Sequence, residues 1–338
     1  MAAKMQIRII KPGLLSTMQD TGRWNYLSQG MPISGAMDTL SSRIANLAVG
    51  NNAHDVVIEF TYGEAEFQAE TDILLAYSGD GATLRVNSLP LPPDRPLFIP
   101  SGTNIHLANN PLGSRTYLAI AGGWDVAEVL GSKSTYVTAG IGGYKGRALE
   151  PDDLLNACGQ LNETSARILQ SLKGTTIKHS KWGIARWLFL PKYRKTVHVI
   201  PAHEFTWFAG KSVVDFLSTP YTVSIQSNRM GYRLEGPSIH RFVKQELLST
   251  AVVPGTIQVT GDGSIVLLMA DCQTTGGYPR IAQVAAVDIP LCAQLKPGDA
   301  VNFKEISRTD AEKLYIHQEN QLDRLAIALK TDMLTVFR

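Results

Sequence analysis

Two polar segments in the second half of the chain hold side chains that could grip a small planar molecule. The first, SNRMGYRLEG (227–236), places Arg229, Tyr232 and Arg233 in a stretch broken by glycines. Guanidinium groups pair bidentately with carboxylates, so at least one of these arginines is a candidate binding residue. Neighbouring arginines on a solvated rim would look the same in sequence. We interpret the segment as one half of a clamp for a small anionic or amide-bearing molecule.

The second segment, DCQTTGGYP (271–279), offers amide, hydroxyl and phenol groups beside two glycines that let a backbone approach closely. Such donors can polarise a lactam carbonyl without a covalent step. A hydrogen-bonded loop between strands is the structural alternative. No basic residue adjoins Cys272 in the sequence, which argues against a nucleophilic thiolate. The predicted binding residues of this half are Gln273, Thr274, Thr275 and Tyr278, with Gln258 on an adjoining strand.

Two motifs near the N-terminus form a second group of candidates. In QDTGR, Asp20 and Arg23 flank a glycine turn, which suits an ion pair or a carboxylate-binding arginine. In PISGAMD, a turn leads into a helix, so backbone N–H groups at Gly35, with Ser34 as the helix cap, could face an anion. Loop stapling and plain helix capping explain the two motifs equally well. Asp38, at the end of the second motif, completes the group.

The sequence lacks the common motifs of a self-contained catalyst. His198, His203 and Glu204 come nearest to a ligand cluster, but their spacing matches no standard zinc motif. GIGGYKGR (140–147) lacks the Gly-Lys-Ser/Thr ending of a phosphate-binding loop. We therefore expect no metal site and no ATP binding by this chain alone. The three cysteines have no paired spacing and indicate reduced thiols.

The composition is that of a nearly neutral globular protein. With 338 residues, 44% of them hydrophobic, the chain is long enough for two domains. The net charge of +2 is too small to attract nucleic acid or a membrane surface strongly. The start carries no signal-peptide pattern, and the apolar run SIVLLMA (264–270) is shorter than the roughly 20 residues of a membrane span. We expect a cytoplasmic protein without nucleic-acid or membrane partners.

Strands dominate the secondary structure that the sequence predicts. Short β-branched segments such as QIRII, ILLAYSG and TIQVTG end at Gly, Pro, Asn or Asp, which favours barrels or sandwiches. Helices are predicted over about 36–49 and 162–174. A third helix is expected from TDAE onward, where Thr309 and Glu312 have capping-box spacing. The expected fold class is mainly β with few helices.

A weak internal repeat suggests that the β architecture is duplicated. The opening strands QIRII (6–10) and TVHVI (196–200) correspond, and three later pairs of segments keep the same order at an offset near 190 residues. Chance similarity of short apolar strands is the alternative. We predict an N-terminal β-barrel domain over 1–160, a helical linker over 161–195, and a C-terminal barrel domain with a final helix over 196–338.

Four blocks of the sequence resemble a known family. They are TMQDTGRWNYLSQGMPISGAMDTLSSRIANLAVGN (17–51), YLAIAGGWDVAEVLGSKSTY (117–136), SNRMGYRLEG, and VPGTIQVTGDGSIVLLMADCQTTGGYPRIAQV (253–284). They look like the signature blocks of the C subunit of bacterial ATP-dependent 5-oxoprolinase, also labelled KipA or allophanate hydrolase subunit 2. The family also forms part of the carboxyltransferase region of biotin-dependent urea carboxylase. The resemblance implies tandem duplicated cyclophilin-like β-barrel domains.

The resemblance also implies a function and partners. It suggests ATP-dependent ring opening of 5-oxo-L-proline to L-glutamate, with a KipI-like B subunit and a LamB/YcsF-like A subunit, the chain being inactive alone. ATP would serve the complex, and no biotin attachment is expected here. Two alternatives stay open: a carboxyltransferase component acting with biotin on urea or another amide, or a non-enzymatic binder of a KipI-like kinase inhibitor. The chain differs from the usual family sequence at PAHEF (201–205) and at Cys272. Because both differences lie beside the expected binding cleft, the resemblance does not identify the substrate.

Overall fold

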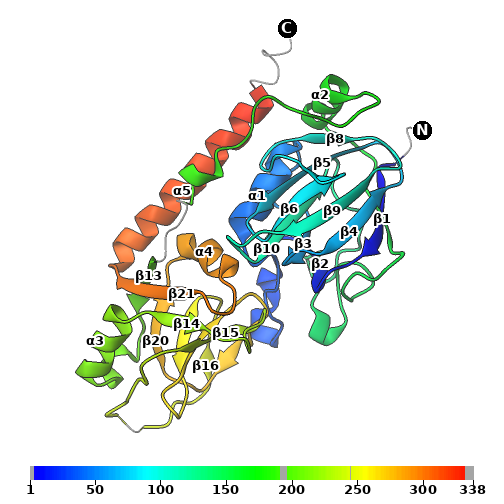
Figure 1. The fold of residues 1–338 in the computed structure, drawn as a ribbon. Helices are drawn as coiled ribbons and strands as arrows, with labels where there is room; N and C mark the ends of the chain where they lie inside the picture. Colours follow the sequence, from blue (N-terminus) through cyan, green and yellow to red (C-terminus); the bar gives the residue numbers. More distant parts are fainter. Residues whose placement is uncertain (1–3, 191–195, 244, 332–338) are drawn as a thin grey trace. The chain divides into compact units, whose positions relative to one another are not determined.

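A computed structural model describes residues 4–190, 196–243 and 245–331. The chain divides into two compact units, each of which combines segments distant in sequence. Unit 1 contains the described residues of 1–22, 38–189 and 321–338, and unit 2 contains those of 23–37 and 190–320. Figure 1 shows the elements of both along the chain.

Unit 1 is built on two six-stranded antiparallel sheets (Figure 1). Strands β4 and β6 bury every second residue, whereas β5 and β10 are buried along their whole length. The first sheet has the order β11 (Leu154–Asn156), β1 (Gln6–Lys11), β4 (Ala65–Ala69), β9 (Asn104–Asn109), β6 (Ala82–Val86), β7 (Leu89–Pro90). The second has the order β12 (Lys178–His179), β8 (Leu97–Ile99), β5 (Ile73–Gly79), β10 (Arg115–Ile120), β3 (Val57–Thr61), β2 (Leu15–Gln19).

Helix α1 (Thr39–Ala48) packs against strands β5 and β10 of unit 1. Its N-cap is Asp38, whose carboxylate accepts hydrogen bonds from Ser41 N at 2.8 Å and Ser41 Oγ at 2.6 Å. The helix therefore starts three residues later than the sequence predicts. Ser34, which was expected to be the cap, instead lies in a turn with a φ of 55°.

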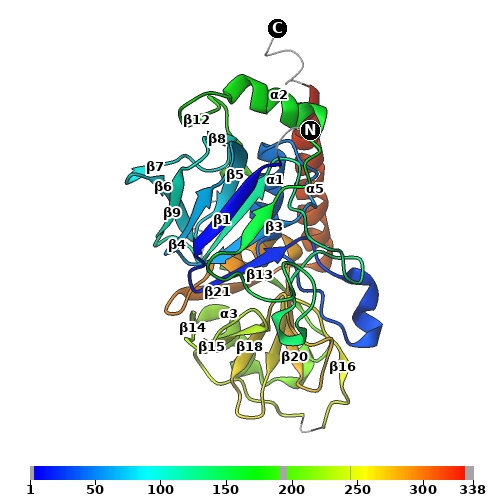
Figure 2. The same ribbon diagram turned by 90° about the vertical axis from the view of Figure 1, so that its right-hand side faces the viewer.

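Unit 2 is organised around a closed seven-stranded barrel. Strands β13 and β21 pair in parallel and the other neighbours are antiparallel. Its interior contains a stacked aromatic pair, Phe216 and Phe303, with ring centroids 4.8 Å apart. The order is β13 (Thr196–Pro201), β20 (Arg280–Val284), β17 (Thr256–Val259), β18 (Ile265–Leu268), β15 (Gly231–Glu235), β14 (Tyr221–Val223), β21 (Ala300–Glu305). Figure 2 labels β13, β14, β15, β18, β20 and β21 of this barrel.

Shorter elements complete the two units. A small ladder pairs β16 (Thr250–Ala251) with β19 (Thr275–Gly276). The remaining helices are α2 (Glu163–Leu172), α3 (Gly210–Ser218), α4 (Ile289–Gln294) and α5 (Arg308–Thr331). The 3-10 turns are η1 (Trp24–Gln29), η2 (Val137–Ala139), η3 (Arg186–Leu188), η4 (Phe205–Trp207) and η5 (Ala286–Asp288). The helix predicted over 162–174 is confirmed.

The cap of α5 differs from the sequence prediction. Ser307 Oγ accepts a hydrogen bond from Asp310 N at 3.1 Å and donates one to an Asp310 carboxylate oxygen at 2.7 Å. The first bond is that of an N-cap hydroxyl, at a position two residues before Thr309, and the second joins the two side chains where a capping box would use the backbone N–H of the cap.

The mainly β fold with few helices is confirmed, and the second half forms a barrel as expected. The division of the chain differs from the predicted boundaries. Residues 23–37 group with unit 2, where Ser34 N donates to Ala270 O at 2.9 Å. Residues 173–189 belong to unit 1, because β12 extends its second sheet and Arg186 pairs with Asp80. Residues 191–195 of the expected linker lie outside the described residues.

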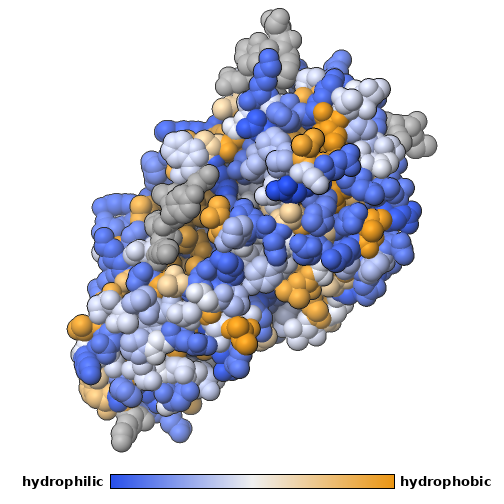
Figure 3. Space-filling view, viewed as in Figure 1, coloured by the Kyte–Doolittle hydropathy of each residue, from blue (hydrophilic) through white to orange (hydrophobic). Residues whose placement is uncertain are grey.

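None of the described helices is both long and apolar enough to cross a bilayer. The face in Figure 3 is mostly hydrophilic, with hydrophobic side chains in small separate groups. Scattered apolar residues of this kind are normal for a protein surface.

Candidate functional site

Four residues form a line across the outside of the unit 2 barrel, which we call the outer row. Strand pairing places Arg233 beside Val266, Val266 beside Gln258, and Gln258 beside Arg280. Their chain neighbours, such as Tyr232, belong to the barrel core, so these four side chains point outward. Neighbouring strands lie about 4.8 Å apart, so Arg233 and Gln258 are about 10 Å apart along the row.

The loop that contains DCQTTGGYP lies over Gln258. Gln258 Nε2 donates to Tyr278 O at 3.3 Å, and Gln258 is only 2% exposed. A Cβ on Gly276 would come within 2.5 Å of the same nitrogen, so the backbone approaches here because residue 276 is glycine. The loop is fixed to the neighbouring segment by Val252 N, which donates to Thr274 O at 3.0 Å. Its side chains at Gln273, Thr275 and Tyr278 are exposed.

The fold therefore brings together only some of the residues that were predicted to form the clamp. Arg233 and Gln258 share the outer row, and the 273–278 loop adjoins it. Arg233 is exposed, and its guanidinium forms no ion pair within the described part of the chain. Tyr232 is 2% exposed and lies in the barrel core, because successive residues of a strand face opposite sides.

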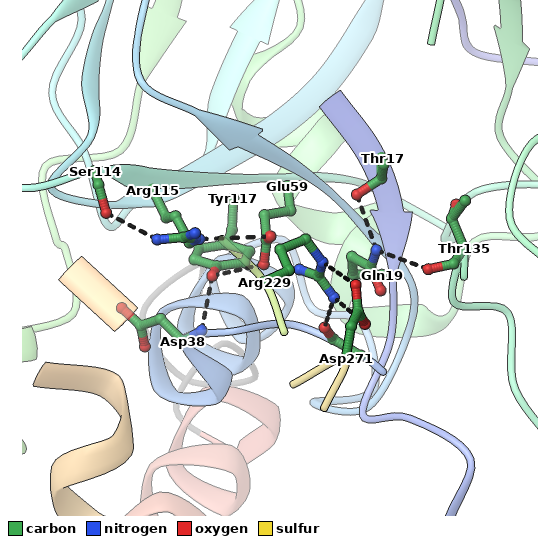
Figure 4. A network of polar contacts seen from close by, with 11 residues as sticks. Thr17, Gln19, Asp38, Glu59, Ser114, Arg115, Tyr117, Thr135, Arg229 and Asp271 are labelled. Atoms are coloured by element: carbon green, nitrogen blue, oxygen red, sulfur yellow. Dashed lines mark hydrogen bonds and ion pairs between the residues drawn. The ribbon is translucent and has the colours of Figure 1, made fainter. Parts of the chain in front are cut away.

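Arg229 has a different environment from Arg233. Its Nε lies 2.7 Å from one Asp271 carboxylate oxygen and its Nη2 lies 3.0 Å from the other (Figure 4). The same Nη2 donates to Gly35 O at 2.7 Å. Arg229 is 6% exposed and Asp271 7%. The guanidinium thus binds a carboxylate of the protein itself and fixes the turn at Gly35.

The Ser34–Gly35 turn is consequently held in an uncommon backbone conformation. Ser34 and Gly35 have φ values of 55° and 83°, and the former is unusual for a residue with a side chain. Ser34 is 3% exposed, and its hydroxyl has no hydrogen-bond partner among the described residues. A buried hydroxyl in this state is a group that a bound molecule could satisfy.

At the start of β20, a second arginine is paired with a buried carboxylate. Arg280 Nε and Nη2 each lie 2.7 Å from a Glu204 oxygen, and Glu204 is 1% exposed. His203 Nδ1 lies 3.2 Å from the same carboxylate, while its side chain is 84% exposed. Burial raises the pKa of Glu204, but hydrogen bonds and charge from Arg280 outweigh burial and hold the pKa below its ordinary value. We call Arg280, Glu204 and His203 the rim triad.

Asp20 of unit 1 links two loops through hydrogen bonds. Its carboxylate accepts hydrogen bonds from Gly22 N at 2.8 Å, Ser132 Oγ at 2.7 Å and Lys133 N at 2.6 Å. These bonds tie the QDTGR turn to the 132–134 segment, which corresponds to the loop-stapling alternative. Arg23, 1% exposed, is assigned to unit 2 and donates its backbone N–H to Ile33 O at 2.7 Å.

Unit 1 also contains a buried polar row that the sequence did not reveal. Cross-strand pairing aligns Thr17, Glu59 and Tyr117, which are all at most 1% exposed. Tyr117 Oη donates to a Glu59 carboxylate oxygen at 2.8 Å and accepts from Asp38 N at 2.7 Å (Figure 4). Gln19 Nε2 donates to Thr17 Oγ1 at 2.8 Å. Burial, together with the charge of Glu59, raises the pKa of Tyr117 well above its ordinary value.

Sequence patterns alone could not identify the pairing of Glu204 with Arg280 or the buried row, because the partners are far apart in the chain. One available signal is a charged residue inside a largely apolar strand, as at Glu59 in VIEFT. Another is the acidic residue that follows strand β13, at Glu204.

Burial and the charge of Asp271 raise the pKa of Cys272 to about 12, so its thiol stays protonated at neutral pH. No group of three or more His, Cys, Asp or Glu side chains placed to hold a metal occurs within the described ranges. His198 Nδ1 lies 3.0 Å from a carboxylate oxygen of buried Asp288 and is separate from the rim triad.

Comparison with known proteins places the chain in a family. A family model described as carboxyltransferase domain, subdomain A and B, matches residues 29–305. The chain belongs to this carboxyltransferase-domain family. A 5-oxoprolinase C subunit from Escherichia coli is 35% identical over 326 residues, covering 96% of this chain and 99% of that protein. One from Haemophilus influenzae is 32% identical over 316 residues, covering 92% and 94% respectively.

A solved carboxyltransferase-domain structure supports the same assignment. The Kluyveromyces lactis urea carboxylase matches with a TM-score of 0.84 at 27% identity. The match covers 96% of this chain but only 30% of that one. The chain thus spans nearly the whole length of the bacterial 5-oxoprolinase relatives and under a third of the urea carboxylase. The family resemblance found in the sequence is confirmed.

Proposed function

We propose that this carboxyltransferase-domain protein is the C subunit of an ATP-dependent 5-oxoprolinase, which opens 5-oxo-L-proline to L-glutamate. The observation that carries the proposal is the match to the Escherichia coli 5-oxoprolinase protein, which covers 96% of this chain and 99% of the relative. The match therefore extends over nearly the whole of both sequences.

The outer row supports a lactam carrying a carboxylate as the ligand. Such a molecule needs a cation for its carboxylate and hydrogen-bond donors for its ring carbonyl. Arg233 supplies an exposed guanidinium, and the adjoining loop supplies Gln273, Thr275 and Tyr278. Gln258 holds that loop through Tyr278 O. In this proposal Arg229 positions the Gly35 turn and does not contact the ligand.

The energetics of the reaction explain the use of ATP and of partners. Lactam opening is uphill, so we propose that ATP phosphorylates the lactam oxygen and that water attacks the activated carbon. The ring C–N bond then breaks with its electron pair on nitrogen, and a second water hydrolyses the resulting acyl phosphate to glutamate and inorganic phosphate. The outer row and its loop would then hold charge that develops during this attack. We propose a KipI-like B subunit and a LamB/YcsF-like A subunit as partners, with ATP bound within the complex.

A carboxyltransferase role is the second candidate, favoured by the structural match to urea carboxylase. It would require biotin on a separate carrier, since the Met-Lys-Met attachment motif does not occur in this sequence. Binding of a KipI-like inhibitor without catalysis is the third. The three functions differ in the molecule that the chain contacts.

Reconstitution distinguishes these functions. The purified chain, the cognate A and B subunits and their mixture would be assayed for glutamate formed from ATP and 5-oxoproline. We expect glutamate only from the complete mixture. Biotin-dependent carboxylation of urea in place of glutamate formation would support the second candidate. Binding to the KipI-like B subunit without any turnover would support the third.

A further inference from the structure

The turn formed by residues 34–36 of unit 2 concentrates hydrogen-bond donors that have no acceptor within the described residues. The Ser34 hydroxyl is buried and has no partner there. Within the same described ranges, the backbone N–H groups of Gly35 and Ala36 donate no hydrogen bond, and both residues are buried. Buried N–H groups without an acceptor are rare in folded proteins. Three such donors in consecutive residues therefore require an explanation.

The scaffold of unit 2 fixes this turn at two points. Arg229 Nη2 donates to Gly35 O at 2.7 Å, while the same guanidinium binds the Asp271 carboxylate (Figure 4). Ser34 N donates to Ala270 O at 2.9 Å. These bonds hold Ser34 in the left-handed region, at a φ of 55°. A residue with a side chain stays in this region only where its surroundings impose it, and such positions cluster at ligand-binding sites.

The turn also lies where the two predicted clamp segments meet. Arg229 belongs to SNRMGYRLEG, and Asp271 is the first residue of DCQTTGGYP. Asp271 N donates to Arg229 O at 2.9 Å, so the two segments adjoin beside the turn. Because Arg229 and Asp271 neutralise each other, the groups that the turn itself offers to a ligand are uncharged donors.

Three adjacent donors suit a group whose oxygens only accept hydrogen bonds. Successive backbone N–H groups in a turn form concavities that bind anions, phosphate among them. In the proposed reaction, the phosphoryl group on the lactam oxygen is an acceptor of this kind. Arg233 was assigned to the substrate carboxylate, so the phosphoryl group still needs donors of its own.

We propose that the turn at residues 34–36 is the phosphoryl-binding site of unit 2, with Arg229 and Asp271 as positioning residues. This inference rests on the proposed function and extends it. The Ser34 hydroxyl and the N–H groups of Gly35 and Ala36 donate to the phosphoryl oxygens of the phosphorylated lactam and then of the acyl phosphate. The same donors hold inorganic phosphate until it leaves. The turn itself forms and breaks no covalent bond.

The test uses the complete complex assembled with wild-type, S34A or S34G chain. Both variants lack the hydroxyl, and glycine also adopts the positive φ without strain. Loss of one preorganised donor typically lowers kcat about 100-fold or more, so we expect a decrease of about 100-fold in both variants. KM for ATP should change less than about twofold, and inorganic phosphate should inhibit both variants more weakly than wild type. Because the lost hydroxyl has no partner among the described residues, both purified variants should unfold at or above the wild-type midpoint.

Ser212 provides a matched control. Ser34 and Ser212 both belong to unit 2 and are both 3% exposed, but Ser212 Oγ accepts a hydrogen bond from His240 N at 2.9 Å. S212A should therefore lower the unfolding midpoint. At a temperature where S212A is folded, its kcat and its inhibition by phosphate should equal those of wild type.

Four outcomes would contradict this proposal. Wild-type kcat and phosphate inhibition in S34A and S34G would overturn the phosphoryl site while leaving the proposed function intact. A raised KM for ATP with unchanged phosphate inhibition would assign the donors to the nucleotide instead. A midpoint lowered in both variants as in S212A would show that the hydroxyl belongs to the scaffold. A wild-type complex that forms no glutamate would overturn the proposed function, and this site with it.

Discussion

The polar row buried in unit 1 and the loop beside the outer row of unit 2 both carry Thr, Tyr and Gln side chains but use them for different purposes. Glu59 and Tyr117 are at most 1% exposed and hydrogen-bond each other. Arg233 is exposed, and the neighbouring loop carries exposed hydroxyl and amide groups. Buried polar groups must be paired within the protein, whereas exposed ones remain available to a ligand. Residue type alone therefore did not separate scaffold from binding surface.

The same difference appears within one segment. Arg229 and Arg233 are four residues apart, yet the first neutralises a buried aspartate and the second faces solvent. Removing a buried partner leaves an uncompensated charge, while removing an exposed one costs little stability. The two arginines therefore provide a direct test of the distinction.

The largest expected effect is the loss of stability in Arg229→Met. Asp271 would remain buried without its cation, which costs about 3–5 kcal/mol of unfolding free energy. Denaturant unfolding of the purified chain measures this change. Arg233→Met is the matched control and should unfold at the wild-type midpoint. Equal midpoints for both variants would contradict the assignment of Arg229 to the scaffold.

Glu59→Leu tests the buried row of unit 1. Tyr117 would lose its hydrogen-bond acceptor in a fully buried place, which costs about 1–3 kcal/mol. Buried Arg115, whose Nε lies 3.7 Å from the same carboxylate, would also lose its counter-charge, which adds to this cost. Thermal unfolding provides the measurement, and Glu128→Leu at an exposed position of unit 1 is the control. A Glu59 variant as stable as that control would mean that the row does not hold the sheet together.

Arg233→Met is expected to affect activity and not folding. Loss of a charged hydrogen bond to the substrate carboxylate costs about 1.5–3 kcal/mol, or roughly 10- to 150-fold in kcat/KM. Steady-state glutamate formation by the complete complex checks this. Full activity in the variant would remove Arg233 from the binding surface.

The smallest effect concerns acid stability at the rim triad. The folded-state pKa of Glu204 lies below its ordinary value of 4.5, so the stability that its ionised form contributes is fully present above about 4.5. That contribution is lost as pH falls through the lowered folded-state pKa. The stability difference between wild type and E204Q should therefore shrink below pH 4.5. A stability difference between the two proteins that is constant from pH 7 to 3 would contradict an ionised Glu204 paired with Arg280.

The sequence predicted the strand-rich architecture, helix α2 and the family, because each depends on local pattern or on long matching blocks. Strand register could not be predicted, and it decides that Arg233 faces outward while Tyr232 faces the core. The partner of Arg229 lies 42 residues away, and that of Glu204 lies 76 residues away. Pairings over such separations depend on the assembled barrel and not on any local motif.

The most direct test of the central proposal is the glutamate released per ATP by purified A and B subunits with and without this chain. We predict ATP-dependent conversion of 5-oxoproline to glutamate only when the chain is present, and none from the chain alone. Equal glutamate formation by the A and B subunits without the chain, or turnover by the chain alone, would contradict its role as the third component of a 5-oxoprolinase.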